Sequence, residues 1–308
     1  MSIEEVYART FVTAAALAAV VAFLVVGAGI LWRKRVGAGG LGIVGGCALA
    51  LAWIAAHLVF RGAGVWADVA RGGNGWKRAL WPIEATERFH VGIVIAVVGG
   101  LLATAAAKRT GRGARALTWA VRIATIGSIA WVAAGPLAAS AFASIVVFGL
   151  AGNAWWAALE DSELATSGAL MPMTASLCSM GFGALMLTHY ATTLGLVAMC
   201  GAVALCVVAI AGVRQPQLTR GPMMCAVITG GWVWLMVAAW VYAMDWPVVA
   251  LVLACAAPTM PALWPKAWVD KRPKWNRWAV QLGGVGTLMG LAAFIVHWLD
   301  HNNPMTRF

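Results

Sequence analysis

The chain has 308 residues, of which 62% are hydrophobic and 11% are charged, and its formal net charge is +11. The charged fraction is less than half that of a soluble domain, and a soluble fold of this size could not bury so much apolar surface. The composition therefore excludes an ordinary soluble protein and predicts an all-α polytopic bundle of transmembrane helices. Lys and Arg occur as short runs at the ends of apolar stretches. They indicate membrane topology and contact with anionic headgroups, not nucleic-acid binding.

Ten apolar stretches, compared with ~20 residues for one bilayer crossing, make 1–308 a single integral membrane domain. They lie at about 11–32, 40–60, 90–107, 117–136, 139–158, 168–188, 191–213, 222–243, 247–264 and 279–299. Pro258 and Pro261 interrupt the ninth stretch, and broken helices line substrate cavities in many transporters. Glycine pairs in the second, third and tenth stretches predict close helix–helix contacts. These glycines are Gly45, Gly46, Gly99, Gly100, Gly283 and Gly284.

The segment 61–89 is expected to form an outer loop and the start of an interfacial helix. Three tryptophans, whose rings suit the membrane interface, occur in it: Trp66, Trp76 and Trp81. Pro82 suits the first turn of a helix, and Glu84 and Glu87 favour its positive N-terminal end. We therefore expect this segment to lie ordered against the outer mouth of the bundle.

Two apolar stretches are too long for a single crossing: 43 residues over 116–158 and 46 over 168–213. Breaks at Gly135-Pro136 and His189-Tyr190 divide them and give ten spans. The alternative is eight spans, in which both stretches remain fused. Fused helices of more than 40 residues would be about 60 Å long, twice the hydrocarbon thickness. Length therefore favours ten spans.

Charge sorts by side when ten spans are laid across a bilayer. One face, with Arg122 counted, carries 15 Lys and Arg against 4 acidic residues, and the other carries 7 of each. Because cytoplasmic loops carry the excess of Lys and Arg, the first face is predicted to be cytoplasmic. The interpretation is a multi-pass protein of the inner (plasma) membrane with both termini outside. Its expected partners are the bilayer, anionic inner-leaflet headgroups and another membrane protein.

All five histidines map to the outer third of the membrane or to the outer loops in this topology. The outer ends of the spans avoid Lys and Arg but tolerate neutral His. This preference accounts for the outer position of the histidines without any binding site. A shared site is the alternative, because other polar groups converge at the same end. The candidate outer-face residues are His57, Glu84, Glu87, Arg88, His90, His189, Asp245 and His297.

Metal binding is one chemistry for this candidate site, with His57, His90 and His297 as ligands, because neutral imidazole is the commonest metal ligand. The second and third spans are consecutive and antiparallel, so His57 and His90 are expected to approach each other. Glu87 is three residues before His90 and is placed to orient it. The sequence itself requires no cofactor.

Arg122 is the one charge inside a span. Either it reaches toward the inner headgroups along its aliphatic stem, or it faces the bundle as an anion site. No Asp or Glu occupies the central part of any span, which counts against a proton relay and most ion-coupled transport.

Three functions remain open. The first is a carrier or channel for a small neutral or amphipathic molecule, favoured by few charges and broken helices. The second is a non-catalytic membrane subunit or scaffold. The third is an outer-face protein that handles metal or haem. No phosphate-binding loop, zinc-protease motif or nucleophile elbow occurs in the sequence, so an enzyme is the less favoured class.

Overall fold

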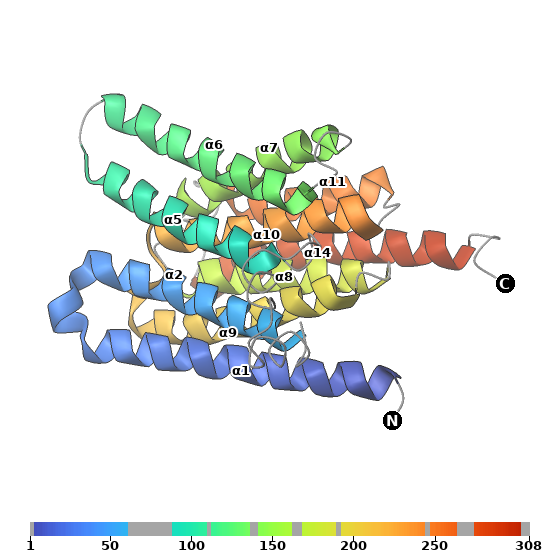
Figure 1. Ribbon diagram of the computed structural model, residues 1–308, viewed down its shortest axis with the longest axis horizontal. Coiled ribbons are helices and arrows are strands. Elements are labelled where there is room, and N and C mark those ends of the chain that lie inside the picture. The colour runs from blue at the N-terminus through green and yellow to red at the C-terminus, as the bar shows by residue number, and fades with distance from the viewer. Residues whose placement is uncertain are drawn as a thin grey trace, which may run out of the picture.

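The computed structural model describes residues 3–60, 88–109, 112–135, 141–161, 168–188, 192–243, 247–263 and 274–302. In these ranges the chain is helical and has no strand, which confirms the all-α fold class (Figure 1). The helices are α1 (Ile3–Leu31), α2 (Arg33–Phe60), α5 (Phe89–Ala107), α6 (Arg112–Ala134), α7 (Phe142–Asp161), α8 (Leu170–Thr188), α9 (Thr192–Arg214), η4 (Pro216–Leu218), α10 (Pro222–Ala243), α11 (Val248–Ala256), η5 (Ala257–Thr259), α12 (Met260–Leu263) and α14 (Lys274–Asn302).

Nine helices of the described part are long and apolar enough to cross a membrane, and a shorter apolar helix covers Val248–Ala262. Together they correspond to the ten predicted spans. Each of the two long apolar stretches is divided into two helices, as the ten-span interpretation requires. At the first division Gly135 has a φ of +60°, which glycine adopts without a steric penalty and which commonly ends a helix.

The ninth span is broken where its prolines predict. Helix α11 ends at Ala256, and a 3₁₀ turn containing Pro258 leads into α12. Proline has no backbone N–H and cannot continue the regular hydrogen-bond ladder. Side chains bond the carbonyl groups just before the break. Thr259 Oγ1 donates to the Ala256 carbonyl at 2.7 Å, and Trp155 Nε1 donates to the Cys255 carbonyl at 2.7 Å.

Helix α10 is the centre of the bundle (Figure 1). It contacts α2, α5, α6, α7, α8 and α9. Within its most apolar stretch 89% of residues are buried, compared with 28% in the peripheral helices α1 and α14. Its sequence is apolar on all sides, as expected of a helix surrounded by other helices.

Glycine residues leave space for large aromatic rings at the centre of the bundle. The fully buried Trp53 of α2 is wedged between α9 and α10, at Gly201 and Gly231. A Cβ atom on Gly231 would lie 2.5 Å from Trp53 Cη2, and one on Gly201 would lie 2.6 Å from Trp53 Cζ2. Trp53 Nε1 also donates a hydrogen bond to the Val197 carbonyl of α9 at 3.0 Å. The indole of Trp53 therefore packs α2 against both α9 and α10.

The predicted glycine contacts are confirmed in the second and third spans. Gly45 and Gly46 lie against Leu218 and Met223, and Gly99 and Gly100 lie against Thr125 and Met223. The prediction was wrong for Gly283, because among the described residues no atom of another helix lies within 4 Å of the position of its Cβ. The reason is that α14 is peripheral and turns this residue away from its neighbours.

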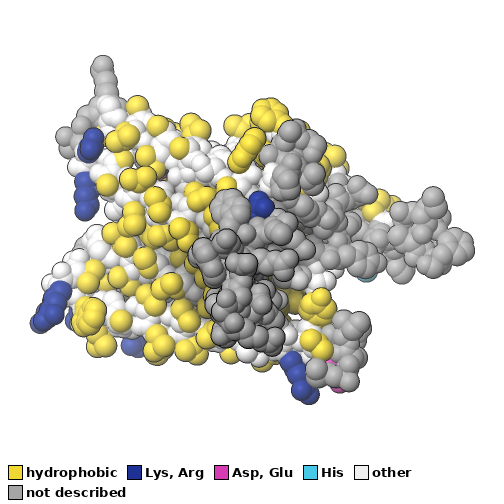
Figure 2. Space-filling model, in the orientation of Figure 1, with side chains coloured by type: hydrophobic (Ala, Val, Ile, Leu, Met, Phe, Trp, Pro, Cys, Tyr) yellow, Lys and Arg dark blue, Asp and Glu magenta, His cyan; other side chains and the backbone are white. Residues whose placement is uncertain are grey.

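Basic side chains gather at the end of the bundle opposite the chain termini. Both termini are at one end, as an even number of crossings requires (Figure 1). Lys and Arg side chains gather at the other end, where α1 meets α2 and α5 approaches α6 (Figure 2). We call the latter the basic end. The residues there include Arg33, Lys34, Arg35, Lys108 and Arg109.

Candidate functional site

Two of the predicted site histidines lie side by side at the end of the bundle opposite to the basic end. His57 is in the last turn of α2, and His90 is in the first turn of α5. Their ring centroids are 6.0 Å apart, with 30° between the ring planes. His57 is only 2% exposed, whereas His90 is half-buried. The expected approach of these two imidazoles is therefore found.

Aromatic rings surround the histidine pair. The Phe89 ring lies 5.3 Å from that of His57 and makes edge contacts with Trp53 at 5.7 Å and Trp234 at 6.3 Å, centroid to centroid. Gly92 on α5 gives Trp234 the space for this packing. Trp53 and His57 are one helical turn apart, so both point from α2 toward the start of α5. The pair thus sits among apolar aromatic rings.

Two of the remaining candidate residues, Arg88 and His297, lie within the described part of the chain. Arg88 directly precedes α5, and His297 lies near the end of α14, which packs on α8, α11 and α12. Glu84, Glu87, His189 and Asp245 lie outside the described residues, as does the expected outer segment up to residue 87. Among the described side chains, no group of three or more His, Cys, Asp or Glu is arranged to hold a metal ion. Metal binding at His57, His90 and His297 stays a prediction.

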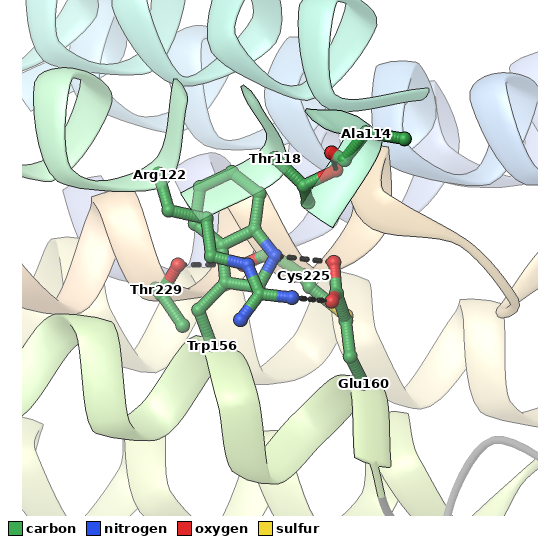
Figure 3. Close-up of polar contacts among 7 residues, drawn as sticks. All are labelled: Ala114, Thr118, Arg122, Trp156, Glu160, Cys225 and Thr229. Carbon is green, nitrogen blue, oxygen red and sulfur yellow. Dashed lines mark hydrogen bonds and ion pairs between the residues drawn. The ribbon is translucent and has the colours of Figure 1, made fainter. Parts of the chain in front are cut away.

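Arg122 forms a partly buried ion pair near the basic end (Figure 3). Its guanidinium Nη2 pairs with Oε2 of Glu160, in the last turn of α7, and Arg122 is 7% exposed. Trp156 Nε1 donates to Oε1 of the same carboxylate at 2.6 Å. The guanidinium carbon also lies 4.8 Å from the ring centroid of Trp119 and 5.8 Å from that of Trp156, within the range of cation–π attraction.

The sequence did not reveal this pair, because Glu160 lies just beyond the predicted span at 139–158 and is 38 residues from Arg122. One signal was present. Trp156 and Glu160 are four residues apart, so they share a helix face if α7 continues through both residues. An acidic residue in the last helical turn is repelled by the negative end of the helix dipole. A cation beside it offsets this repulsion. Arg122 is that cation.

A second unpredicted constellation lies in the middle of the bundle. The rings of Trp155, Phe182 and Trp232 contact one another with centroids 5.7–5.8 Å apart. Trp232 Nε1 donates to Ser179 Oγ at 2.9 Å, and Trp155 Nε1 binds the carbonyl of Cys255 just before the break after α11. We call Trp155, Ser179, Phe182 and Trp232 the central cluster. It joins α7, α8, α10 and the broken span.

The central cluster extends from the middle of the bundle toward the ion pair, since Trp155 is followed directly by Trp156. Ser179 and Trp232 each lie at the midpoint of their helices. None of the four residues is charged, and all are fully or almost fully buried. Ser179 and Trp232 therefore offer a hydroxyl group and an aromatic face at the middle of the membrane-crossing length.

No protein-family model matches this chain, and no curated protein matches its sequence. In its described residues the chain is a polytopic apolar helical bundle of the kind that membrane proteins have.

Proposed function

We propose that this protein is a membrane carrier for a small neutral or amphipathic molecule, with the central cluster as its substrate site. The observation that carries the proposal is the broken span, whose Cys255 carbonyl is held by Trp155 at the edge of the cluster. Transporter sites commonly lie near the midplane, beside discontinuous helices. A broken helix provides backbone groups that can exchange partners as the site opens.

The chemistry of the central cluster favours an uncharged substrate. Apolar pockets with a few polar groups bind small molecules by burial and orient them by hydrogen bonds. Trp155, Phe182 and Trp232 supply apolar faces, and Ser179 supplies one hydroxyl group. A charged substrate would have to leave its charge unpaired here, at a cost of several kcal/mol in a low-dielectric interior.

Alternating access to Ser179 tests the carrier without knowledge of the substrate. Ser179→Cys is made in a chain whose six native cysteines are replaced by alanine. A small charged methanethiosulfonate reagent is then added to either side of the membrane. A carrier opens to each side in turn, so position 179 is expected to be modified from both sides although Ser179 is fully buried in this structure.

Ala238→Cys in the same background is the matched control, because Ala238 is equally buried on α10 but lies outside the central cluster. It is expected to stay unmodified. If position 179 reacts no faster than position 238 from either side, the carrier proposal is refuted. The remaining function is then a non-catalytic membrane subunit or scaffold, whose test is co-purification of a stoichiometric membrane partner.

The histidine pair favours a second candidate function, binding of a metal ion or haem. Two imidazoles with centroids 6.0 Å apart can serve as two ligands after small rotations, since metal–nitrogen bonds are ~2.0–2.1 Å long. Absorbance spectra and elemental analysis of the purified protein test this candidate. Stoichiometric metal or a haem band, lost in His57→Phe with His90→Phe, is the expected result. Protein that is colourless and metal-free after growth with iron, copper and zinc would rule it out.

A further inference from the structure

We propose that a cleft between α5 and α6 at the basic end binds a phosphate group, carried by an anionic lipid headgroup or by a free phosphate ion. The cleft has a volume of about 310 Å³. At ~30 Å³ per water molecule it holds about ten waters, which is room for a phosphate and part of an attached alcohol. Its lining residues are Ala106, Ala107, Arg109, Ala114, Arg115, Thr118, Trp119 and Arg122.

Three arginines line this cleft, one just after α5 and two on α6. Arg109 follows the end of α5, and Arg115 and Arg122 lie seven residues apart on α6. Residues seven apart share a helix face and are about 10.5 Å apart along the axis. The basic surface of the cleft therefore extends over two helical turns. Guanidinium is the side-chain group best matched to phosphate, because its planar fork donates two parallel hydrogen bonds.

The deepest of the three guanidinium groups is held in place. Arg122 is fixed by its ion pair with Glu160 (Figure 3). It also lies against the Trp119 ring, which lines the cleft. In the described part of the chain Arg122 Nε is buried and has no hydrogen-bond partner. Holding the side chain in advance removes the entropy cost of ordering it when an anion arrives.

The charge at the cleft is unbalanced. Among the described residues no acidic side chain lines it, and Glu160 behind Arg122 offsets one of the three positive charges. Arg109 and Arg115 are exposed at its mouth. Topology alone requires Lys and Arg near this end of the bundle. It does not require them to converge on one concave site around a fixed, buried arginine.

The surface beside the cleft suits a lipid. Trp119 is 48% exposed, and Ile123, one turn deeper on α6, is 58% exposed. An amphipathic ring next to an apolar surface is the arrangement expected at the boundary between headgroups and acyl chains. A lipid phosphate in the cleft would place its chains against this surface, whereas free phosphate would use the cleft alone.

Calorimetric titration of the purified full-length protein in a neutral detergent tests the site. The probes are dioctanoyl phosphatidic acid, dioctanoyl phosphatidylcholine and inorganic phosphate. The wild type is compared with the double variant Arg109→Gln, Arg115→Gln. The matched control is Arg33→Gln, Arg35→Gln, which removes the same charge from exposed positions at the same end but outside the cleft.

The Kd of the wild type for phosphatidic acid is expected to rise about 30-fold in the cleft variant, about fivefold for each guanidinium, and less than twofold in the control. Binding of phosphatidic acid alone identifies a lipid headgroup as the ligand. Binding of inorganic phosphate with the same dependence on Arg109 and Arg115 identifies a free phosphate. The proposal is overturned if the wild type binds none of the three probes, or if the cleft and control variants weaken binding equally.

Discussion

The wedge of Trp53 between α9 and α10 gives the most direct test of the bundle core. Gly231→Ala places a Cβ 2.5 Å from Trp53 Cη2, closer than real Cβ contacts occur. The ring cannot move away freely, because Gly201 closes the other side and the indole N–H is bound to the Val197 carbonyl. Overpacking of a core costs about 1–3 kcal/mol, and loss of the indole hydrogen bond adds about 1 kcal/mol. We expect Gly231→Ala to lower the free energy of unfolding by about 2–4 kcal/mol.

Unfolding in mixed detergent micelles, followed by near-ultraviolet circular dichroism, measures this change. Gly127→Ala on α6 is the matched control, because within the described part of the chain no atom of another helix lies within 4 Å of its Cβ position. It should be neutral or stabilising by up to about 1 kcal/mol, from helix propensity alone. Trp53→Phe shortens the ring at the point of conflict, so Gly231→Ala should cost less in that background. Equal stabilities of the Gly231→Ala and Gly127→Ala variants would refute the wedge.

Three further predictions concern the ion pair, the broken span and the topology. Glu160→Gln leaves the Arg122 charge buried without its carboxylate, so unfolding should become easier by about 1–3 kcal/mol, reduced from the value for a fully buried pair because the Glu160 side chain is 22% exposed. Adding Arg122→Met should recover part of that loss, and strict additivity of the two changes would contradict the pairing. Trp155→Phe removes the hydrogen bond to the Cys255 carbonyl and should cost about 1–3 kcal/mol in the same unfolding assay; no change would mean that the carbonyl finds another donor. Reporter fusions are expected to score external after residues 74, 245 and 305 and cytoplasmic after residues 35, 112, 163, 218 and 272. Cytoplasmic scores at both termini would reverse the predicted orientation.

The span pattern of the fold was accessible from the sequence, because each element carries its own signal. Hydropathy and length placed the helices, and Gly135 and Pro258 marked a helix end and a break where the backbone requires one. The approach of His57 to His90 followed from chain order alone, since their helices are consecutive. These inferences depend on local composition and on the fixed thickness of a bilayer.

Side-chain contacts between distant helices were not accessible. The pairing of Arg122 with Glu160 depends on how α7 is rotated about its axis. Helix α6 has a polar face that includes Arg115, Thr118 and Arg122, but α7 is apolar over most of its length, so its sequence does not show which side meets α6. The central cluster depends on which of 18 tryptophans face one another, and Trp sits equally well in a core and at an interface. Gly283 shows the same limit, because a glycine at a contact and one facing outward are identical in sequence.

The central position of α10 has a consequence for biogenesis. This helix is the eighth of the ten predicted crossings to leave the ribosome, yet six earlier helices pack against it. A nascent chain synthesised from the N-terminus therefore inserts the surrounding helices before the central helix α10. Until Pro222–Ala243 enters the membrane, the faces of α2 and α5 to α9 that it will cover must be met by lipid, by one another or by the insertion machinery. A chain arrested before this helix should be a substrate for membrane proteases, and one released after it should resist them.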